Sequence, residues 1–254
     1  MPTENTLFVG KVLVQLPEVD STNRYAQMLL AKNRPIEGTV ISTFHQTQGQ
    51  GQIGSTWESE PHQNLALSII LYPVFLPPHA AFALNMALSL AVRDFVAAHV
   101  PGPVRIKWPN DIYIGDRKTC GLLIQNTIAG NRWQTSVAGI GVNVNQCAFS
   151  PHVPNATSFA LETGQSFELP PLLTALCHTV EQRYLSLKNS PTMHTFLPEY
   201  LQQLYRFGEV ALFRRPNGQV FQGTITGLNP DGKLLMARPK GILEVFGIKE
   251  ITFL

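Results

Sequence analysis

The chain has 254 residues, a formal net charge of +2 and 44% hydrophobic residues, a composition typical of a globular protein with a substantial core. The near-neutral charge gives no reason to expect a nucleic-acid partner, which would need a clustered basic face. No stretch approaches about 18 unbroken apolar residues and no basic segment precedes an apolar run at the N-terminus, so we expect neither a membrane span nor a signal peptide. The three cysteines are scattered without a CxxC pair, which argues against zinc and disulfides and indicates a reducing, cytoplasmic setting.

The first predicted elements are a strand over residues 7–16 and a helix that ends near residue 33. Asp20 or Ser21 can cap this helix, so the polar run that begins at Ser21 needs no role beyond helix initiation. A helix N-terminus also presents free backbone N–H groups, which suit an acceptor such as a carbonyl oxygen. From the residues alone, both interpretations stay open.

A β-branched strand at residues 39–44 leads into a glycine-rich stretch that ends at Trp57. Its glycines match the GxGxxG dinucleotide-binding pattern: Gly49, Gly51 and Gly54. That pattern requires a helix directly after the glycines, whereas an apolar strand over residues 65–71 follows here. The sequence therefore predicts a flexible loop whose backbone N–H groups approach a phosphate or carboxylate. Trp57 is either an ordinary core residue or a ring that is available for stacking.

After a packing helix at residues 80–100, the sequence predicts a β-hairpin with a two-residue turn at Gly115-Asp116. Lys107-Trp-Pro-Asn-Asp111 precedes that turn, and Lys118 follows it. Two ammonium groups near a carboxylate and an amide suit a polyanion with a bound metal ion. A solvated hairpin with surface lysines is the alternative.

The strand at residues 133–145 contains Gly139 and Gly141, which remove side chains from one face so that a flat ligand can lie against the backbone. Asn143, near its end, bonds either a ribose or phosphate, or only the backbone of a turn. Two amphipathic helices are predicted at residues 172–187 and 194–207. Short strands separated by turn residues fill residues 208–254, a pattern typical of a small SH3-like barrel.

Lys107-Trp-Pro-Asn-Asp111, followed by Asp116-Arg-Lys118 and Gly121, resembles the signature of biotin–protein ligases. The polar run at residues 21–23, the glycine loop and the strand at residues 133–145 match the same family in the same order. The resemblance implies an α+β fold: a mixed sheet with helices, like that of class II aminoacyl-tRNA synthetases, plus a small C-terminal SH3-like barrel. It implies a catalytic domain at residues 1–207 and a second domain at residues 208–254.

The resemblance also implies a reaction. An ATP-dependent ligase of this kind forms biotinyl-5′-AMP with Mg²⁺ and transfers biotin to a lysine of a biotin carboxyl carrier protein. The implied catalytic residues are Lys118, Lys107 and Asp111, the last also as the Mg²⁺ ligand. The implied biotin contacts are Ser21, Thr22, Asn23, Gln46, Gly49, Gln50, Gly51, Gln52, Lys118, Gly121, Gly139 and Gly141. The implied ATP contacts are Gln50, Gln52, Trp57, Lys107, Asn110 and Asn143.

The glycine loop departs from the family in one respect, because it lacks the usual arginines. A neutral amide makes weaker hydrogen bonds than a guanidinium, so we expect a looser hold on ATP or the adenylate unless Arg105, Arg117 or Lys118 compensates. The missing arginines leave a non-catalytic biotin-binding protein as one alternative. A lipoate–protein ligase, which shares the fold but not normally the Lys-Trp-Pro-Asn-Asp stretch, is another. The family further implies a possible homodimer and, with a strand predicted from residue 7, no DNA-binding segment.

Overall fold

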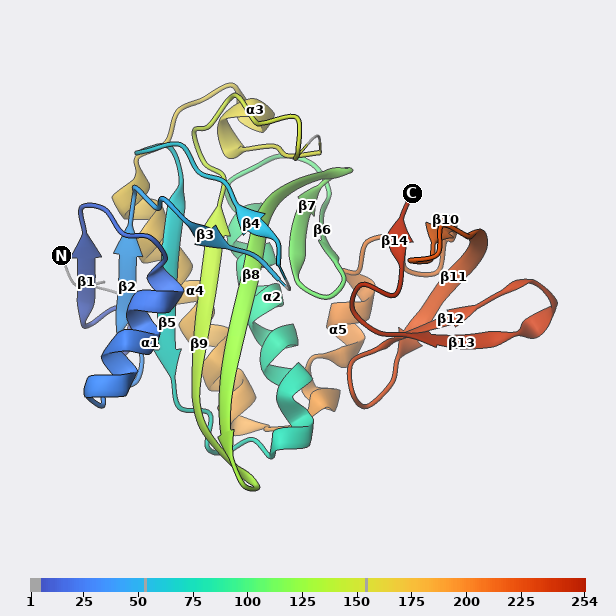
Figure 1. Cartoon of the computed structure of the whole chain (residues 1–254), viewed down its shortest axis with the longest axis horizontal. Coiled ribbons are helices and arrows are strands. Elements are labelled where there is room, and N and C mark those ends of the chain that lie inside the picture. Colours follow the sequence, from blue (N-terminus) through green and yellow to red (C-terminus); the bar gives the residue numbers. More distant parts are fainter. Residues whose placement is uncertain (1–5, 53, 154) are drawn as a thin grey trace.

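The computed structural model describes residues 6–52, 54–153 and 155–254. The N-terminal residues that bear on the signal-peptide expectation, and Ile53 in the glycine loop, lie outside these ranges. The described chain forms a seven-stranded sheet with helices on both faces and a separate five-stranded sheet at its C-terminal end (Figure 1). This α+β arrangement confirms the fold class expected from the sequence.

The large sheet has the strand order β1-β2-β5-β9-β8-β7-β6. Its strands are β1 (Leu13–Leu16), β2 (Val40–Thr43), β5 (Leu65–Leu71), β6 (Val104–Lys107), β7 (Asp111–Ile114), β8 (Arg117–Ala129) and β9 (Arg132–Val142). Only β1 and β2 pair in parallel; the other neighbours are antiparallel. Strand β5 is buried along its whole length because both of its faces are covered, as its unbroken apolar sequence indicates.

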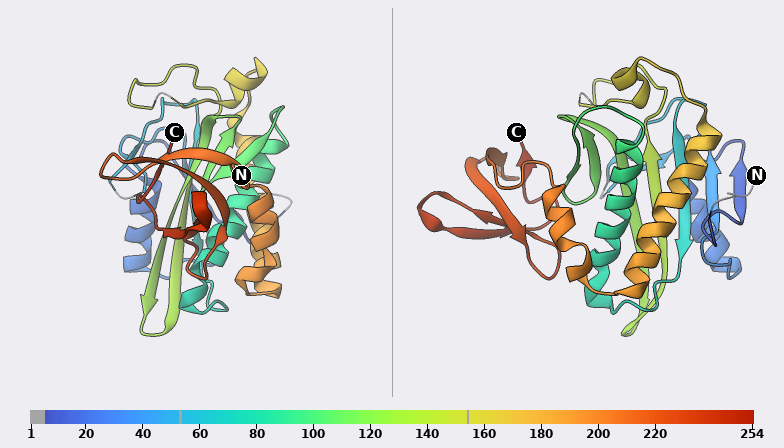
Figure 2. Two further views of the ribbon diagram at one scale, coloured as in Figure 1. Left: turned by 90° about the vertical axis from the view of Figure 1, so that its right-hand side faces the viewer. Right: turned by 180° about the vertical axis from the view of Figure 1, so that it is seen from behind.

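Helices cover the two faces of this sheet unequally. Helix α2 (Ala81–Ala97) and helix α4 (Leu169–Asn189) pack together on one face, as the view from behind shows (Figure 2). Helix α1 (Thr22–Lys32) lies on the opposite face against β5 and β9, and its small apolar cluster includes Ala26, Ile41 and Val137. No helix of the described chain covers the part of that face beside the start of α1, and the glycine-rich segment lies over it (Figure 1).

Helix α2 is apolar on most of its surface because it lies between the sheet and α4. Together with the turn before it, at Pro78–Ala97, it is long and apolar enough to cross a membrane by length and composition alone. Within the described residues, 61% of that window is buried in the protein, which is the behaviour of a core helix.

Two predicted elements are shorter than expected. The strand predicted over residues 7–16 is regular only in β1, because residues 7–9 instead donate their backbone N–H groups to the buried Glu181 carboxylate of α4. The helix predicted over residues 194–207 is limited to a 3₁₀ turn, Met193–Thr195, and α5 (Leu197–Gln202). The short helix α3 (Phe159–Thr163) starts after Ser158, whose hydroxyl accepts a hydrogen bond from the Leu161 N–H.

The C-terminal sheet has the order β13-β12-β11-β10-β14. Its strands are β10 (Val210–Arg214), β11 (Val220–Leu228), β12 (Leu234–Ala237), β13 (Leu243–Phe246) and β14 (Thr252–Phe253), a small antiparallel arrangement that fits the expected SH3-like barrel. Trp108, in the turn between β6 and β7, donates its indole N–H to the Gly232 carbonyl at 2.9 Å. Gly232 has φ +78°, and a β-carbon there would overlap the ring of Phe82 on α2. The barrel is therefore fitted closely against the start of α2.

Candidate functional site

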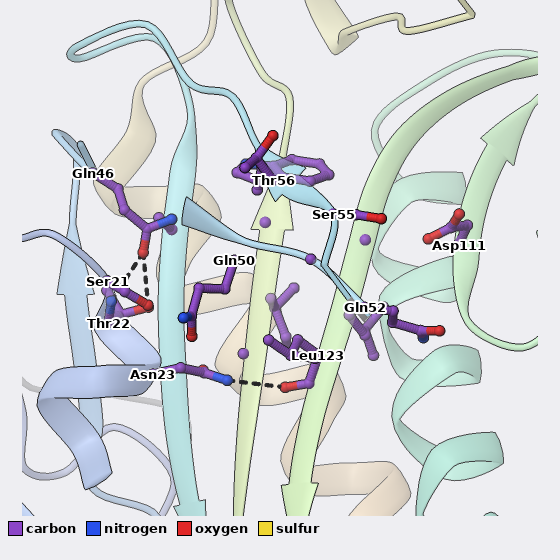
Figure 3. A pocket seen from close by; sticks show the side chains of 18 of the residues that line it. Ser21, Thr22, Asn23, Gln46, Gln50, Gln52, Ser55, Thr56, Asp111 and Leu123 are labelled. Atoms are coloured by element: carbon purple, nitrogen blue, oxygen red, sulfur yellow. Dashed lines mark hydrogen bonds between the residues drawn. The ribbon is translucent and has the colours of Figure 1, made fainter. Parts of the chain in front are cut away.

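The open face of the large sheet contains a cavity of about 240 Å³, bounded by the N-terminus of α1, by β8 and β9, and by the glycine-rich segment. That segment is not an irregular loop, as the sequence suggested. Gly49–Gln50 (β3) pairs with Thr56–Trp57 (β4), and the Gly51 N–H donates to the Ser55 carbonyl at 2.8 Å. We call residues 49–52 and 54–57 the glycine hairpin. It covers the cavity from the side opposite the sheet (Figure 3).

One end of the cavity is polar and buried. Ser21, Thr22 and Asn23 are each at most 4% exposed. Ser21 is the N-cap of α1 by position, but its side chain makes no capping hydrogen bond. Gln46 fixes this end of α1, because its Oε1 accepts from the Thr22 backbone N–H at 2.9 Å (Figure 3).

Asn23 has its amide orientation set by three neighbours. Its Nδ2 donates to the Leu123 carbonyl at 3.2 Å and to Gln125 Oε1 at 2.9 Å, and its Oδ1 accepts from the Ser68 hydroxyl at 2.6 Å. Ser68 is fully buried and its Oγ also lies 2.8 Å from Thr22 Oγ1. The cavity therefore ends in a fixed array of amides and hydroxyls, and Gln125 and Ser68 are members that the sequence did not reveal.

The glycines of β9 make room for side chains of the protein itself. A β-carbon at Gly139 would overlap the Asn23 amide, and one at Gly141 would lie 2.5 Å from Trp57 Cε2. A β-carbon at Gly121 on β8 would meet Trp57 and Lys118 at 3.0–3.3 Å. All three glycines line the cavity, but the interpretation that Gly139 and Gly141 leave a bare strand for a flat ligand is corrected: Asn23 and Trp57 occupy that space.

Lys118 and Asp111 form an ion pair at the other end of the cavity. Lys118 Nζ lies 2.7 Å from Asp111 Oδ1, and both side chains are about one-third exposed (33% and 32%), so they are reachable from solvent. The ammonium also lies 5.7 Å from the centroid of the Trp57 ring. Cys120, the neighbouring cysteine, is fully buried and burial raises the pKa of its thiol, which fits a packing residue rather than a nucleophile.

A second cavity, of about 210 Å³, lies on the other side of Trp57 and shares Trp57, Thr56 and Lys118 with the first. It is mainly apolar, but two buried polar atoms on its lining residues have no hydrogen-bond partner among the described residues. These are the Trp57 indole N–H and Asn143 Oδ1; the Asn143 Nδ2 donates to the Thr157 carbonyl at 3.0 Å. An unpaired buried donor and acceptor favour a ligand that supplies the opposite groups.

Comparisons with known proteins agree with this geometry. The sequence model of the biotin/lipoate A/B protein ligase family matches residues 16–143, about half of the chain, including both ends of the first cavity. The chain belongs to this family. Its members among curated proteins include the bifunctional ligase/repressor BirA of Bacillus spizizenii, 29% identical over 246 residues that cover 95% of this chain and 74% of BirA.

Two further relatives are similar over most of this chain. The biotin–[acetyl-CoA-carboxylase] ligase of Mycobacterium tuberculosis is 27% identical over 86% of this chain and 80% of its own length. The structure of the biotin protein ligase of Aquifex aeolicus in complex with biotin and ATP superposes with a TM-score of 0.77, covering 95% of this chain and 98% of that one, at 24% identity. The latter similarity shows that the fold of the family extends through the C-terminal barrel.

Most residues predicted for the site line these cavities. The first cavity is lined by Ser21, Thr22, Asn23, Gln46, Gln50, Gly51, Gln52, Trp57, Asp111, Lys118, Gly121, Gly139 and Gly141, and the second by Asn143 with Trp57 and Lys118. Gly49, Asn110 and Lys107 line neither. Gly49 instead packs directly against the backbone of Trp57, and Asn110 is 3% exposed beneath the glycine hairpin.

Lys107 lines neither cavity, although its hydrogen-bond partner Tyr113 lines the second. Its ammonium makes cation–π contacts with the rings of Tyr113 and Phe253, at 4.9 and 5.1 Å from their centroids. It also donates a hydrogen bond to the Tyr113 hydroxyl at 3.0 Å. Desolvation lowers the pKa of Lys107, and the nearby Asp111 carboxylate offsets part of this effect. A direct contact with phosphate would require this side chain to leave the interface with β14.

Of the three cations considered as substitutes for the missing arginines, only Lys118 faces the cavity. Arg105 donates to Gln203, and Arg117 is paired with Glu162 at 2.7 Å. The structure adds Ile248 and Lys249, which reach the first cavity from the barrel segment between β13 and β14. These two residues could not be predicted, because nothing local marks a residue near the C-terminus that packs against a distant part of the chain.

The donor set for a metal ion is small. The described residues contain no cluster of three or more His, Cys, Asp or Glu side chains, so they form no all-protein metal site. Asp111 is the carboxylate that faces the cavity. Mg²⁺ commonly binds one or two carboxylates and takes its remaining ligands from water and substrate phosphates. The residues therefore fit a Mg²⁺ ion that arrives with a nucleotide, with Asp111 as its protein ligand.

Proposed function

We propose that this protein is a biotin–protein ligase, which makes biotinyl-5′-AMP from biotin and ATP and transfers biotin to a lysine of a biotin carboxyl carrier domain. The observation that carries the proposal is the arrangement of the two cavities. One ends in a buried array of amides and hydroxyls, the other has an unpaired donor and acceptor, and they meet at Lys118 and Trp57. The names of relatives that act on acetyl-CoA carboxylase support the acceptor class.

The polar end of the first cavity favours biotin over lipoate. A cyclic urea has one carbonyl acceptor and two N–H donors, which the Ser21, Thr22 and Asn23 groups can match. A dithiolane ring has no comparable groups, so it could not use the hydrogen-bonding capacity that this end retains, such as the Ser21 hydroxyl, which makes no capping bond. Discrimination of this kind is strong, because a site built to hydrogen-bond its substrate rejects an analogue that lacks those groups.

The second cavity suits the adenine of ATP. Its apolar walls and the indole of Trp57 offer surface for a flat aromatic ring. The unpaired Asn143 Oδ1 can accept from the exocyclic amine of adenine, and the Trp57 N–H can donate to a nucleotide acceptor. With adenine in the second cavity, the α-phosphate would lie where the two cavities meet, beside Lys118.

In the first step, a carboxylate oxygen of biotin attacks the α-phosphorus of ATP, and pyrophosphate leaves. Two anionic groups must approach one another, so the Lys118 ammonium between them lowers the repulsion and stabilises the charge that develops. Asp111 holds that ammonium in place through the 2.7 Å pair. Mg²⁺, when bound with the nucleotide, would neutralise phosphate charge, with Asp111 as its ligand.

In the second step, a neutral lysine amine of the carrier attacks the carbonyl carbon of the mixed anhydride. The C–O bond to AMP breaks, AMP leaves with that electron pair, and the amine loses a proton as the amide forms. The first step is accelerated mainly by orientation, because biotin and ATP are held end to end in adjoining cavities.

The test is biotin transfer to a purified carrier domain, followed by mass spectrometry, together with pyrophosphate release. The unchanged protein should release pyrophosphate with biotin and ATP and should label the carrier. Lys118→Ala should reduce adenylate formation by about 100-fold or more. The matched control is Lys233→Ala, an exposed barrel lysine outside the cavities, which should keep full activity.

Two outcomes would favour the other candidates. Biotin binding without pyrophosphate release would indicate a non-catalytic biotin-binding protein. The lack of arginines in the glycine hairpin is the observation that favours this alternative. Transfer of lipoate in preference to biotin would indicate a lipoate–protein ligase, despite the polar end of the cavity.

A further inference from the structure

Three side-chain amides connect the glycine hairpin to helix α2 through the turn before β7. Gln52 Nε2 donates to Asn110 Oδ1 at 2.6 Å, and Asn110 Nδ2 donates to Asn85 Oδ1 at 2.9 Å. Asn85 Nδ2 in turn donates to the Pro109 carbonyl at 2.9 Å. We call Gln52, Asn110 and Asn85 the amide relay. Its members come from three segments that are far apart in the sequence and share no local motif.

The relay has a fixed direction. Each member offers its NH₂ group to the next acceptor, and Asn110 and Asn85 use their oxygens to receive the preceding donor. Asn110 is only 3% exposed, so its oxygen cannot easily turn to water if the donor from position 52 is lost. Position 52 must therefore carry a hydrogen-bond donor, a condition that glutamine and arginine both meet and glutamate does not.

The relay is rigid at one end. Asn85 belongs to α2, the core helix between the sheet and α4. The Pro109 carbonyl that it holds also accepts from the hydroxyl of Tyr200 at 2.7 Å, and Tyr200 is fully buried. The turn at Pro109 and Asn110 is thus fixed from two helices, whereas Gln52 lies on a hairpin with only two short strands. The core helices therefore fix the turn, and the turn restrains the hairpin through the hydrogen bond to Gln52.

We propose that Asn85 is a positioning residue that, through the amide relay, holds the glycine hairpin over the active-site cavity before any ligand binds. The proposal rests on the proposed function for the meaning of that cavity. It explains why position 52 can be glutamine: the donor to Asn110 is retained although the positive charge is not. A hairpin ordered in advance loses little further freedom on binding, so more of the contact energy holds the adenylate.

The first test needs no ligand. Hydrogen exchange of the Gly51 and Ser55 amides, which form the hydrogen bonds of the hairpin turn, is measured in the unchanged protein and in Asn85→Ala. Loss of about one or two hydrogen bonds should speed this exchange by about tenfold. Asn126→Ala, an exposed asparagine on β8 outside the relay, is the matched control and should leave the rate unchanged. Equal rates in all three proteins would overturn the proposal.

The direction of the relay supplies a second test that does not depend on Asn85→Ala folding well. Gln52→Arg keeps a donor and should keep slow exchange, whereas Gln52→Glu has nearly the same shape but no donor and should exchange about tenfold faster. Asn85→Asp, which retains the acceptor for Asn110, should lie between Asn85→Ala and the unchanged protein. Fast exchange in Gln52→Arg, or slow exchange in Gln52→Glu, would contradict a directed relay.

A third measurement connects the relay to the reaction. Asn85→Ala should release biotinyl-AMP to solvent about tenfold faster, while its formation rate and the KM for biotin change by less than about twofold. Failure of the unchanged protein to form any biotinyl-AMP would remove the proposed function and leave the exchange result standing. Normal adenylate formation with unchanged release and exchange in Asn85→Ala would remove the relay and leave the function standing.

Discussion

At the scale of single residues, the close contacts of glycine define the site more than its charges do. Gly141 has no side chain because the Trp57 indole lies directly against its backbone. Trp57 in turn separates the two cavities and lines both. Gly141 of β9 thereby sets the position of an indole that lines both cavities.

Gly141→Ala should push the indole away from β9 and weaken binding in both cavities. We expect the KM for ATP to rise by about tenfold, since overpacking of this kind costs about 1–3 kcal/mol. Steady-state kinetics with biotin and ATP would measure it. Gly227→Ala is the control, because its added methyl group would lie 3.8 Å from Leu235, an ordinary contact. If Gly141→Ala and Gly227→Ala had the same kinetics, the role given to Trp57 would be contradicted.

Lys107 lends itself to a prediction about pH. Its folded pKa lies below its usual value because of desolvation, so between the folded pKa and about 10.5 the unfolded chain binds more protons than the folded one. Stability should therefore rise with pH through that window, and the charged form should be a net cost at neutral pH. Lys107→Met should raise the melting temperature at pH 7 by on the order of 2–4 °C.

The difference in melting temperature between the two proteins should shrink as the pH approaches about 10.5, because the penalty disappears when Lys107 deprotonates. A constant difference from pH 7 to about 10.5 would show that the pKa is not depressed. Kinetics of Lys107→Met also test the predicted phosphate contact: a large increase in the KM for ATP would mean that this side chain turns toward the nucleotide during the reaction.

At the scale of helices and strands, Glu181 of α4 organises the start of the chain. Its carboxylate accepts from the backbone N–H groups of Leu7, Phe8 and Val9 at 2.6–2.9 Å, and the side chain is 4% exposed. Glu181→Gln has the same shape but replaces one acceptor oxygen by a donor. We expect a loss of about 1–3 kcal/mol in the free energy of unfolding, measured by denaturant titration. Glu168→Gln, an exposed position before the same helix, should change it by less than about 0.5 kcal/mol.

The elements that the sequence predicted well are those with a strong local pattern. The buried run of β5, the turn at Gly115-Asp116 between β7 and β8, and the start of α1 after Ser21 all appear where expected. Apolar runs, turn glycines and caps are local signals, so they survive in any tertiary context. The strand prediction was wrong at residues 7–9 because their partner, Glu181, lies more than 170 positions away.

The candidate site shows the same division. Most residues named from the family resemblance line the two cavities, and they could be named because the signature is recognisable in the sequence. The direction of Lys107, the reason for Gly141, the amide relay and the approach of Lys249 could not be predicted, since each depends on packing between segments remote in the sequence. The roles of the individual site residues stay predictions that the experiments above address.

At the scale of the whole molecule, the barrel is placed by a small contact at the start of α2. Gly232 lies against Phe82, and its carbonyl receives the Trp108 indole N–H. The same barrel brings Ile248 and Lys249 to the first cavity. Its position should therefore influence catalysis although its own strands lie outside the large sheet.

Gly232→Ala should displace the barrel, since the added methyl group would overlap the Phe82 ring. We expect lower transfer activity, by about tenfold, with biotin binding at the α1 end of the cavity little changed, measured by kinetics and calorimetry. Gly218→Ala is the matched control, because Gly218 has a similar positive φ (+85°) but nothing within 4 Å of its β-carbon. An equal effect in both variants would show that backbone strain, and not the position of the barrel, is responsible.

Trp57 lines both cavities, and this has a consequence for compounds aimed at the protein. A molecule that links a urea bicycle to a purine must bend around the indole edge near Lys118, so tether length and curvature should govern potency more than the strength of either head group. Trimming the indole to a small side chain would merge the cavities, and straight, rigid tethers that the native protein rejects should then fit.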